Sequence, residues 1–191
     1  MYAGAWGSSI SWLSDAGVAN SAGLELDTYF GYKGAADVVS YDVGFLRYNY
    51  PATYAAGAVK ADTNEIYGAV TYSFVTAKVS YSLGDLFGVA DAQGSTYIEL
   101  NASYALADMG VTLGAHYGKQ TYKGTPADTL KAGGNDPTYA DYKLSATKDF
   151  SGYVVGLAYS DSDAGTFYTS ITPQAKELGK GTAVLSVSRS F

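Results

Sequence analysis

The chain ends with the stretch Gly181-Thr-Ala-Val-Leu-Ser-Val-Ser-Arg-Ser-Phe191, in which apolar and small polar residues alternate up to a terminal aromatic residue. Alternation with a period of two is typical of a β-strand that has one apolar and one polar face. A final strand of this kind, ending on Phe, is typical of bacterial outer-membrane barrels. The stretch therefore predicts an all-β fold, an antiparallel up-and-down transmembrane β-barrel.

The composition is compatible with a barrel and excludes a helical membrane protein. The chain has 191 residues, enough for one domain spanning 1–191, and 47% of them are hydrophobic. No apolar run reaches the roughly 18 residues that a membrane helix needs. The 19 Tyr and 23 Gly against 4 Pro favour strands and tight turns. The net charge of -6 argues against nucleic acid as a partner.

The period-two pattern divides the chain into about ten strands, most of them near the length that a tilted membrane strand needs. They are expected at 2–13, 24–33, 38–50, 64–75, 77–84, 95–106, 111–121, 140–149, 153–162 and 182–191. Short connections are expected at 34–37, 75–76, 107–110 and 150–152, and the connections between them are long. This alternation predicts short turns at the periplasmic end and long loops outside.

Each strand has one apolar and one polar face. In the second strand, Leu24, Leu26 and Phe30 share a face opposite Glu25 and Asp27. A small soluble barrel would fill its interior with apolar side chains, so a polar face of this kind favours a water-filled lumen and a lipid-facing exterior. The alternative is a soluble sandwich with tyrosine-rich strands.

Aromatic residues at the strand ends are expected to form girdles at the two membrane interfaces. The girdle residues are Tyr2, Trp12, Tyr32, Tyr41, Phe74, Tyr81, Tyr104, Tyr117, Tyr142, Tyr159 and Phe191. One residue departs from the pattern, because Arg47 falls on the apolar face of its strand. Either a β-bulge changes the register there, or Arg47 lies at the outer interface, where a charge costs little. The second alternative is slightly favoured.

The polar face is expected to line the lumen. Its pore-lining residues are Glu25, Asp27, Asp42, Glu65, Lys78, Glu99, Asn101, His116 and Lys143, with Asp141 near the outer rim. Acids outnumber bases, which favours passage of cations. Alternatively, these groups pair across the barrel, Lys78 and Lys143 with neighbouring carboxylates, and plug a narrow lumen.

Nothing in the sequence indicates catalysis, a cofactor or a metal site. The chain has no Cys, and His116 is its one histidine, which rules out Cys-based sites and sites with several His ligands. No nucleophile elbow accompanies the many Ser residues. The predicted function is a porin-like channel for ions or small polar solutes with a mild cation preference. The alternative is a plugged structural or adhesin-like barrel whose loops bind a partner.

Several segments also resemble a known family. They are Tyr2-Ala-Gly-Ala-Trp6, Leu24-Glu-Leu-Asp27 with Gly31-Tyr32, Ser40-Tyr-Asp-Val-Gly44, Glu65-Ile-Tyr-Gly68, Val79-Ser-Tyr-Ser82 and Val184-Leu-Ser-Val-Ser188 before Phe191. Together they resemble the TorF-family porins of proteobacteria. The resemblance implies an outer-membrane barrel with a pore role, and it implies no catalytic or binding residues. Members of that family have about one more strand pair before the segment matching Tyr2 to Trp6. Either a full-length form is expected to have about twelve strands, or this chain is a shortened form that closes with about ten.

The expected location is the bacterial outer membrane. The partners are then outer-membrane lipid and lipopolysaccharide, together with the barrel-assembly machinery, which would engage the last strand ending in Phe191. A homo-oligomer fits the same apolar face, because a lipid-facing surface and a subunit interface have the same composition.

Overall fold

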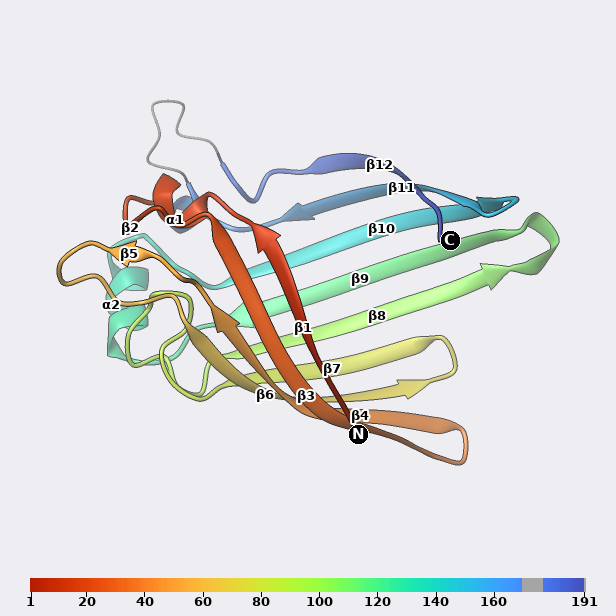
Figure 1. Ribbon diagram of the computed structural model, residues 1–191, viewed down its shortest axis with the longest axis horizontal. Helices are drawn as coiled ribbons and strands as arrows, with labels where there is room; N and C mark the ends of the chain where they lie inside the picture. Colours follow the sequence, from red (N-terminus) through yellow and green to blue (C-terminus); the bar gives the residue numbers. More distant parts are fainter. Residues whose placement is uncertain (170–176, 191) are drawn as a thin grey trace.

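The computed structural model describes residues 1–169 and 177–190, and these form an all-β fold. Ten strands make one sheet in the order β1-β3-β4-β6-β7-β8-β9-β10-β11-β12, and every neighbouring pair is antiparallel (Figure 1). The strands of the sheet are β1 (Tyr2–Ser9), β3 (Leu24–Ala36), β4 (Val39–Asn49), β6 (Thr63–Tyr72), β7 (Val75–Ser82), β8 (Thr96–Leu106), β9 (Val111–Thr121), β10 (Tyr139–Phe150), β11 (Tyr153–Ser162) and β12 (Thr182–Ser188). The ten strands expected from the alternating pattern are therefore confirmed.

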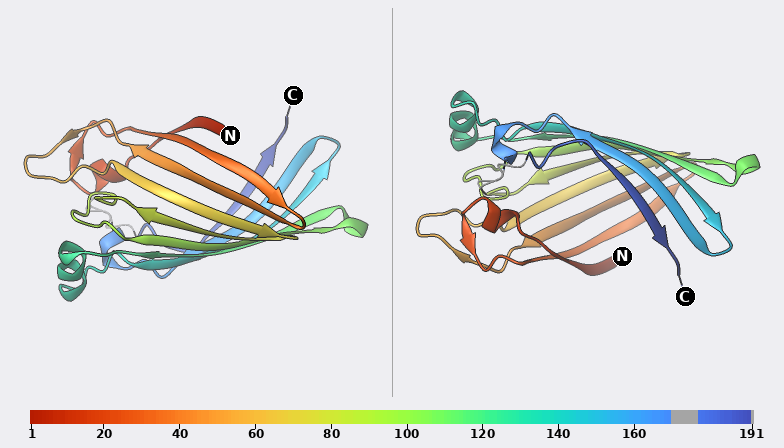
Figure 2. Two further views of the ribbon diagram at one scale, coloured as in Figure 1. Left: turned by 90° about the horizontal axis from the view of Figure 1, so that it is seen from below. Right: turned by 90° about the horizontal axis from the view of Figure 1, so that it is seen from above.

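The sheet is curled into a trough rather than closed. Figure 2 shows β1 and β12 bordering its open side, and in the described part of the chain these two edge strands do not pair. Strand order and direction bear out the antiparallel up-and-down arrangement. Closure into a barrel stays a prediction.

Short turns connect the strands at one end of the trough. Two-residue turns need positive φ, which Asp37 (54°), Ser73 (54°) and Ser151 (55°) supply. The turn expected at 75–76 was misplaced, because β6 ends at Tyr72 and β7 begins at Val75. This shift of two residues leaves every side chain on its expected face.

The opposite end carries the long loops, which contain structure that the alternating pattern did not predict (Figure 1). They hold α1 (Trp12–Asp15), α2 (Thr125–Ala132), the 3-10 helix η2 (Thr166–Tyr168) and a two-stranded sheet of β2 (Ala19–Asn20) with β5 (Thr53–Tyr54); a second 3-10 helix, η1 (Ala107–Met109), lies in a short turn. Helix α2 has Pro126 in its first turn and Lys131 in its last, both favourable positions. The first strand was expected to run to residue 13, but it ends at Ser9 and α1 follows.

The buried apolar residues lie in these loops and not on the sheet. One cluster contains Leu13, Ala19, Ala22, Tyr50 and Ala61. A second cluster contains Leu86, Val89, Ala92, Tyr122 and Ala127. Phe87 packs against both clusters, so the two join into one cap at the loop end.

Candidate functional site

The polar face of the sheet is its concave face. Tyr2 on β1 donates a hydrogen bond to Asp42 Oδ1 at 2.5 Å and contacts the hydroxyl of Tyr67 on β6, three strands further along the sheet. The two rings lie along this face, above Gly31 and Gly44. This face is the more enclosed one, because Asp27 and Glu65 on it are 8% and 5% exposed, whereas Phe30 on the opposite face is 60% exposed. The polar side chains therefore point into the trough.

All nine residues expected to line a lumen share this concave face. The register shows it, because directly paired residues point to the same side: Lys143 pairs with His116, His116 with Asn101, and Glu99 with Lys78. Asp42, Glu65, Asp27 and Glu25 fall on the same face of β4, β6 and β3. That they line a pore stays a prediction.

The centre of the concave face holds a continuous hydrogen-bonded chain across four strands. His116 Nε2 lies 2.9 Å from Asp141 Oδ1, and His116 Nδ1 lies 2.7 Å from Asn101 Oδ1. Asn101 in turn donates to Glu99 Oε2 at 3.0 Å, and Lys78 forms an ion pair with Glu99 at 3.1 Å. The expected pairing of Lys78 with a neighbouring carboxylate is thus confirmed.

The hydroxyl of Tyr97 completes this chain by donating to Asp141 Oδ2 at 2.9 Å. His116 and Asp141 have the spacing of a base and its orienting acid, but the hydroxyl beside them is committed to the acid. Each side chain in this hydrogen-bonded series donates to or accepts from another member, which indicates a structural role. Lys143 makes no ion pair among the described residues, so its expected pairing is not found.

Charge is unbalanced near the loop end of the concave face. Lys33 pairs with Asp42 at 3.6 Å and Lys78 pairs with Glu99, whereas no Lys or Arg pairs with Glu25, Asp27 or Glu65 in the described part of the chain. Asp27 is 8% exposed and Glu65 is 5% exposed. We refer to Glu25, Asp27 and Glu65 as the acidic patch.

The loop cap covers the strand ends next to the acidic patch. Phe87 packs edge-on against Tyr48, with 5.0 Å between ring centroids, and its backbone N–H donates to the hydroxyl of Thr63 at 2.9 Å. Thr63 is fully buried. Sequence reasoning missed Phe87 and Thr63, because neither belongs to an alternating pattern that would have marked it.

Tyrosines in the cap are held in their neutral form. Burial raises the pKa of Tyr50 and of Tyr122 well above the ordinary value of 10.0. In the nearby loop, burial tends to raise the pKa of Asp136, but bonds from Thr138 and Lys131 outweigh it and lower that pKa. The Lys131 ammonium lies 3.4 Å from this carboxylate.

The convex face is apolar and exposed, and seven of the expected girdle residues lie on it: Tyr32, Tyr41, Tyr81, Tyr104, Tyr117, Tyr142 and Tyr159. Phe74 lies in the turn between β6 and β7 and packs against Tyr104 of this face. The other three differ. Tyr2 turns onto the concave face, because it pairs with Gly31 and its ring fills the space above that glycine. Trp12 lies in α1 and packs against Tyr50 in the cap. Phe191 lies outside the described residues.

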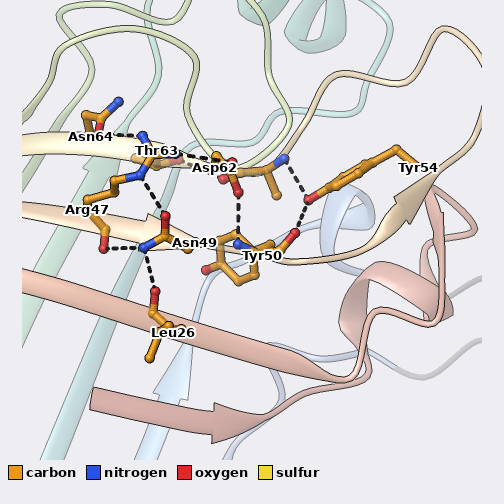
Figure 3. A network of polar contacts seen from close by, with 9 residues as sticks. Leu26, Arg47, Asn49, Tyr50, Tyr54, Asp62, Thr63 and Asn64 are labelled. Carbon is orange, nitrogen blue, oxygen red and sulfur yellow. Dashed lines mark hydrogen bonds and ion pairs between the residues drawn. The ribbon is translucent and has the colours of Figure 1, made fainter. Parts of the chain in front are cut away.

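Arg47 lies on the convex face close to the loop end of β4. The pairing of β4 with both neighbours is continuous through it, which excludes the bulge. That Arg47 lies at a membrane interface stays a prediction. Figure 3 shows that its guanidinium donates to Asn49 at 2.6 Å and to Asn64 at 3.0 Å and pairs with Asp62 at 3.4 Å. Asp62 also accepts the Tyr50 N–H, so the network ties the loop to two strands.

Among the described residues, no helix is long and apolar enough to cross a membrane. No group of three or more His, Cys, Asp or Glu side chains there is arranged to hold a metal ion.

This geometry defines a class: an antiparallel all-β protein with an exposed apolar convex face and a charged concave face. The chain belongs to the family described as "Bacterial protein of unknown function (Gcw_chp)", whose model matches residues 1–191. Neither a curated protein nor a solved structure matches it.

Proposed function

We propose that this protein is a bacterial outer-membrane β-barrel that acts as a passive channel for ions or small polar solutes, with a mild preference for cations. The observation that carries the proposal is the distribution of side chains between the two faces of the sheet. Large apolar residues such as Phe30, Ile98 and Leu144 are 58 to 63% exposed on the convex face. A soluble barrel has the opposite arrangement, and soluble monomers rarely expose a large contiguous apolar surface.

We expect the sheet to close into a barrel in the membrane, because of its backbone hydrogen bonds. Open strand edges do not occur in lipid, because their backbone N–H and C=O groups would have no partners. Ten strands in alternating directions leave β1 and β12 antiparallel to one another. We therefore expect these edges to join in the membrane, directly or through a further hairpin. The resemblance to TorF-family porins supports the same arrangement.

The cation preference rests on the charges of the concave face. Lys33 and Lys78 each have a carboxylate partner, and the acidic patch has no such cation among the described residues. A constriction with excess carboxylates attracts cations and repels anions.

A plugged structural or adhesin-like barrel is the second candidate, and the loop cap favours it. Two small apolar cores joined at Phe87 give the loops a packing of their own. Such a cap could close the lumen or present a surface to a partner. This candidate predicts a folded barrel without steady conductance.

The test is conductance of the purified protein in a planar bilayer under a salt gradient. We expect discrete steps and a reversal potential that shows cation preference. Glu25→Gln and Glu99→Gln should both move the reversal potential toward zero, the value of a non-selective pore. Asp108→Asn removes an exposed charge in a turn and should leave the reversal potential unchanged. Absence of steps would favour the plugged barrel, and anion preference would refute the assignment of the concave face.

In the cell, we expect the protein in the outer membrane, in contact with outer-membrane lipid and lipopolysaccharide and assembled through its last strand. Membrane fractionation of cells that express the natural gene would check this. Recovery in the outer-membrane fraction is the expected result, and recovery in a soluble fraction would contradict it.

A further inference from the structure

The acidic patch lies on neighbouring strands around one aromatic side chain. Asp27 on β3 pairs in register with Tyr48 on β4, and Tyr48 pairs with Thr63 on β6. Glu65 is two residues beyond Thr63 on the same face, and Glu25 is two residues before Asp27. Glu65 pairs in register with Leu46, two residues before Tyr48 on β4. The three carboxylates thus lie on one face, on the two strands that flank Tyr48.

Two carboxylates of this patch, Asp27 and Glu65, are buried, and no Lys or Arg forms an ion pair with the patch in the described part of the chain. Asp27 is more than nine-tenths buried, and its Oδ1 has no hydrogen-bond partner among the described residues. A buried carboxylate oxygen without a donor is costly, and such atoms are rare in native proteins. A ligand that brings a positive charge and an N–H donor would satisfy both requirements.

The surroundings favour an organic cation over a metal ion. In the described chain, the acids and histidine do not converge as metal ligands. Trp6 on β1 pairs in register with Asp27 on the concave face, and Tyr48 lies on its other side. Aromatic rings beside a carboxylate suit a cation with a delocalised charge, and a guanidinium is weakly hydrated and carries several planar N–H donors.

We propose that the acidic patch is a binding site for an organic cation bearing N–H donors, with a guanidinium group as the best fit, and that Asp27 is its principal acceptor. This assignment rests on the proposed function in one respect: the concave face must be reached by solutes. It names the class of solute that the channel would hold on its way through.

The chain provides its own reporter for this site. It contains 2 Trp, and Trp12 lies in the cap, so a Trp12→Phe variant leaves Trp6 beside Asp27 as the one tryptophan. Its fluorescence can be followed in the full chain in detergent micelles at constant ionic strength. The probe is methylguanidinium chloride, and tetramethylammonium chloride provides the same charge without an N–H donor.

We expect a saturable change of Trp6 fluorescence with methylguanidinium and none with tetramethylammonium. Asp27→Asn should weaken the methylguanidinium affinity at least tenfold, and Glu65→Gln should weaken it in the same direction. Asp108→Asn is the matched control for removal of one negative charge and should change nothing. Circular dichroism would identify a variant that fails to fold, in which case the second patch variant decides.

Two results would overturn the site: no saturation with methylguanidinium, or saturation that both patch variants leave intact. Equal binding of tetramethylammonium would show a general electrostatic attraction and would refute the N–H donor requirement. Saturable binding together with an absence of bilayer conductance would reject the channel and keep the site. Conductance without saturable binding would reject the site and keep the channel.

Discussion

The hydroxyl of Tyr2 contacts the hydroxyl of Tyr67, although two other strands separate β1 from β6 in the sheet. Both rings lie along one face of the sheet, above Gly31 and Gly44. The charged residues of the alternating pattern lie on that side, and the apolar ones lie on the other. The distinction between inside and outside, which periodicity alone cannot make, follows from burial, because Asp27 and Glu65 are 8% and 5% exposed and Phe30 on the opposite face is 60% exposed.

A charge on the convex face should impair insertion. Leu100→Lys or Val70→Lys places an ammonium where we expect lipid, at a cost of about 2 to 4 kcal/mol near the midplane. Folding into lipid vesicles, followed by urea titration, would measure it. Ser103→Lys on the concave face of β8 should cost far less, and equal losses at the two faces would mean that the faces are assigned wrongly.

A methyl group at Gly31 should destabilise the sheet. Its Cβ would lie 2.7 Å from the backbone oxygen of Val43 and 2.5 Å from the Tyr2 hydroxyl, and the backbone oxygen cannot move aside cheaply. We expect Gly31→Ala to lower the free energy of unfolding by about 1 to 3 kcal/mol. Gly7→Ala is the control, because the nearest atom to its Cβ would be 3.6 Å away. Similar losses for both variants would contradict the close approach.

The ten strands were predictable because each repeats a period of two over seven or more residues. Whether a residue has an odd or even position in its strand then decides which face its side chain shares. The loop cap was not predictable. No local pattern in 83–95 announces that Phe87 packs against Tyr48, since the contact depends on which loops meet in space. Helix α2 has only 8 residues, and so short an apolar pattern in a Gly-rich loop is a weak indication of a helix.

The candidate site was predictable only in part. The alternation of odd and even positions identified Glu25, Asp27 and Glu65, but the burial of Asp27 and Glu65 was not visible in the sequence. Tyr2 was misassigned because aromatic residues near strand ends fit either face. Only its pairing with Gly31 shows which one it takes.

Thr63 should anchor the cap to the sheet. Thr63→Val keeps the shape but removes the acceptor of the Phe87 N–H, which leaves a buried donor unpaired at a cost of about 1 to 3 kcal/mol. In this variant, amide hydrogen exchange of residues 83–95 should be faster than in the unchanged protein. Thr112→Val on β9, away from the cap, is the control. Unchanged exchange in the loop would show that the apolar contacts of Phe87 are sufficient.

The loop after α2 should loosen in acid. The pKa of Asp136 is lowered in the folded protein, so its contribution to stability is present above the unfolded-state pKa of about 4 and is lost as pH falls through the folded pKa. Because the pair with Lys131 is largely exposed, the effect should be below about 1 kcal/mol. Exchange of the Thr138 amide, corrected for intrinsic rates, would report it. Asp136→Asn should remove the pH dependence, and its persistence would assign the effect to another group.

The central claim, that the convex face meets lipid and the concave face meets water, is tested most directly on β8. The chain has no Cys, so single cysteines at positions 98 to 102 can carry a spin label one at a time in lipid vesicles. We expect labels at 98, 100 and 102 to be accessible to oxygen dissolved in the bilayer. Labels at 99 and 101 should be much less accessible to oxygen. Equal oxygen accessibility at all five positions, without a period of two, would contradict the account.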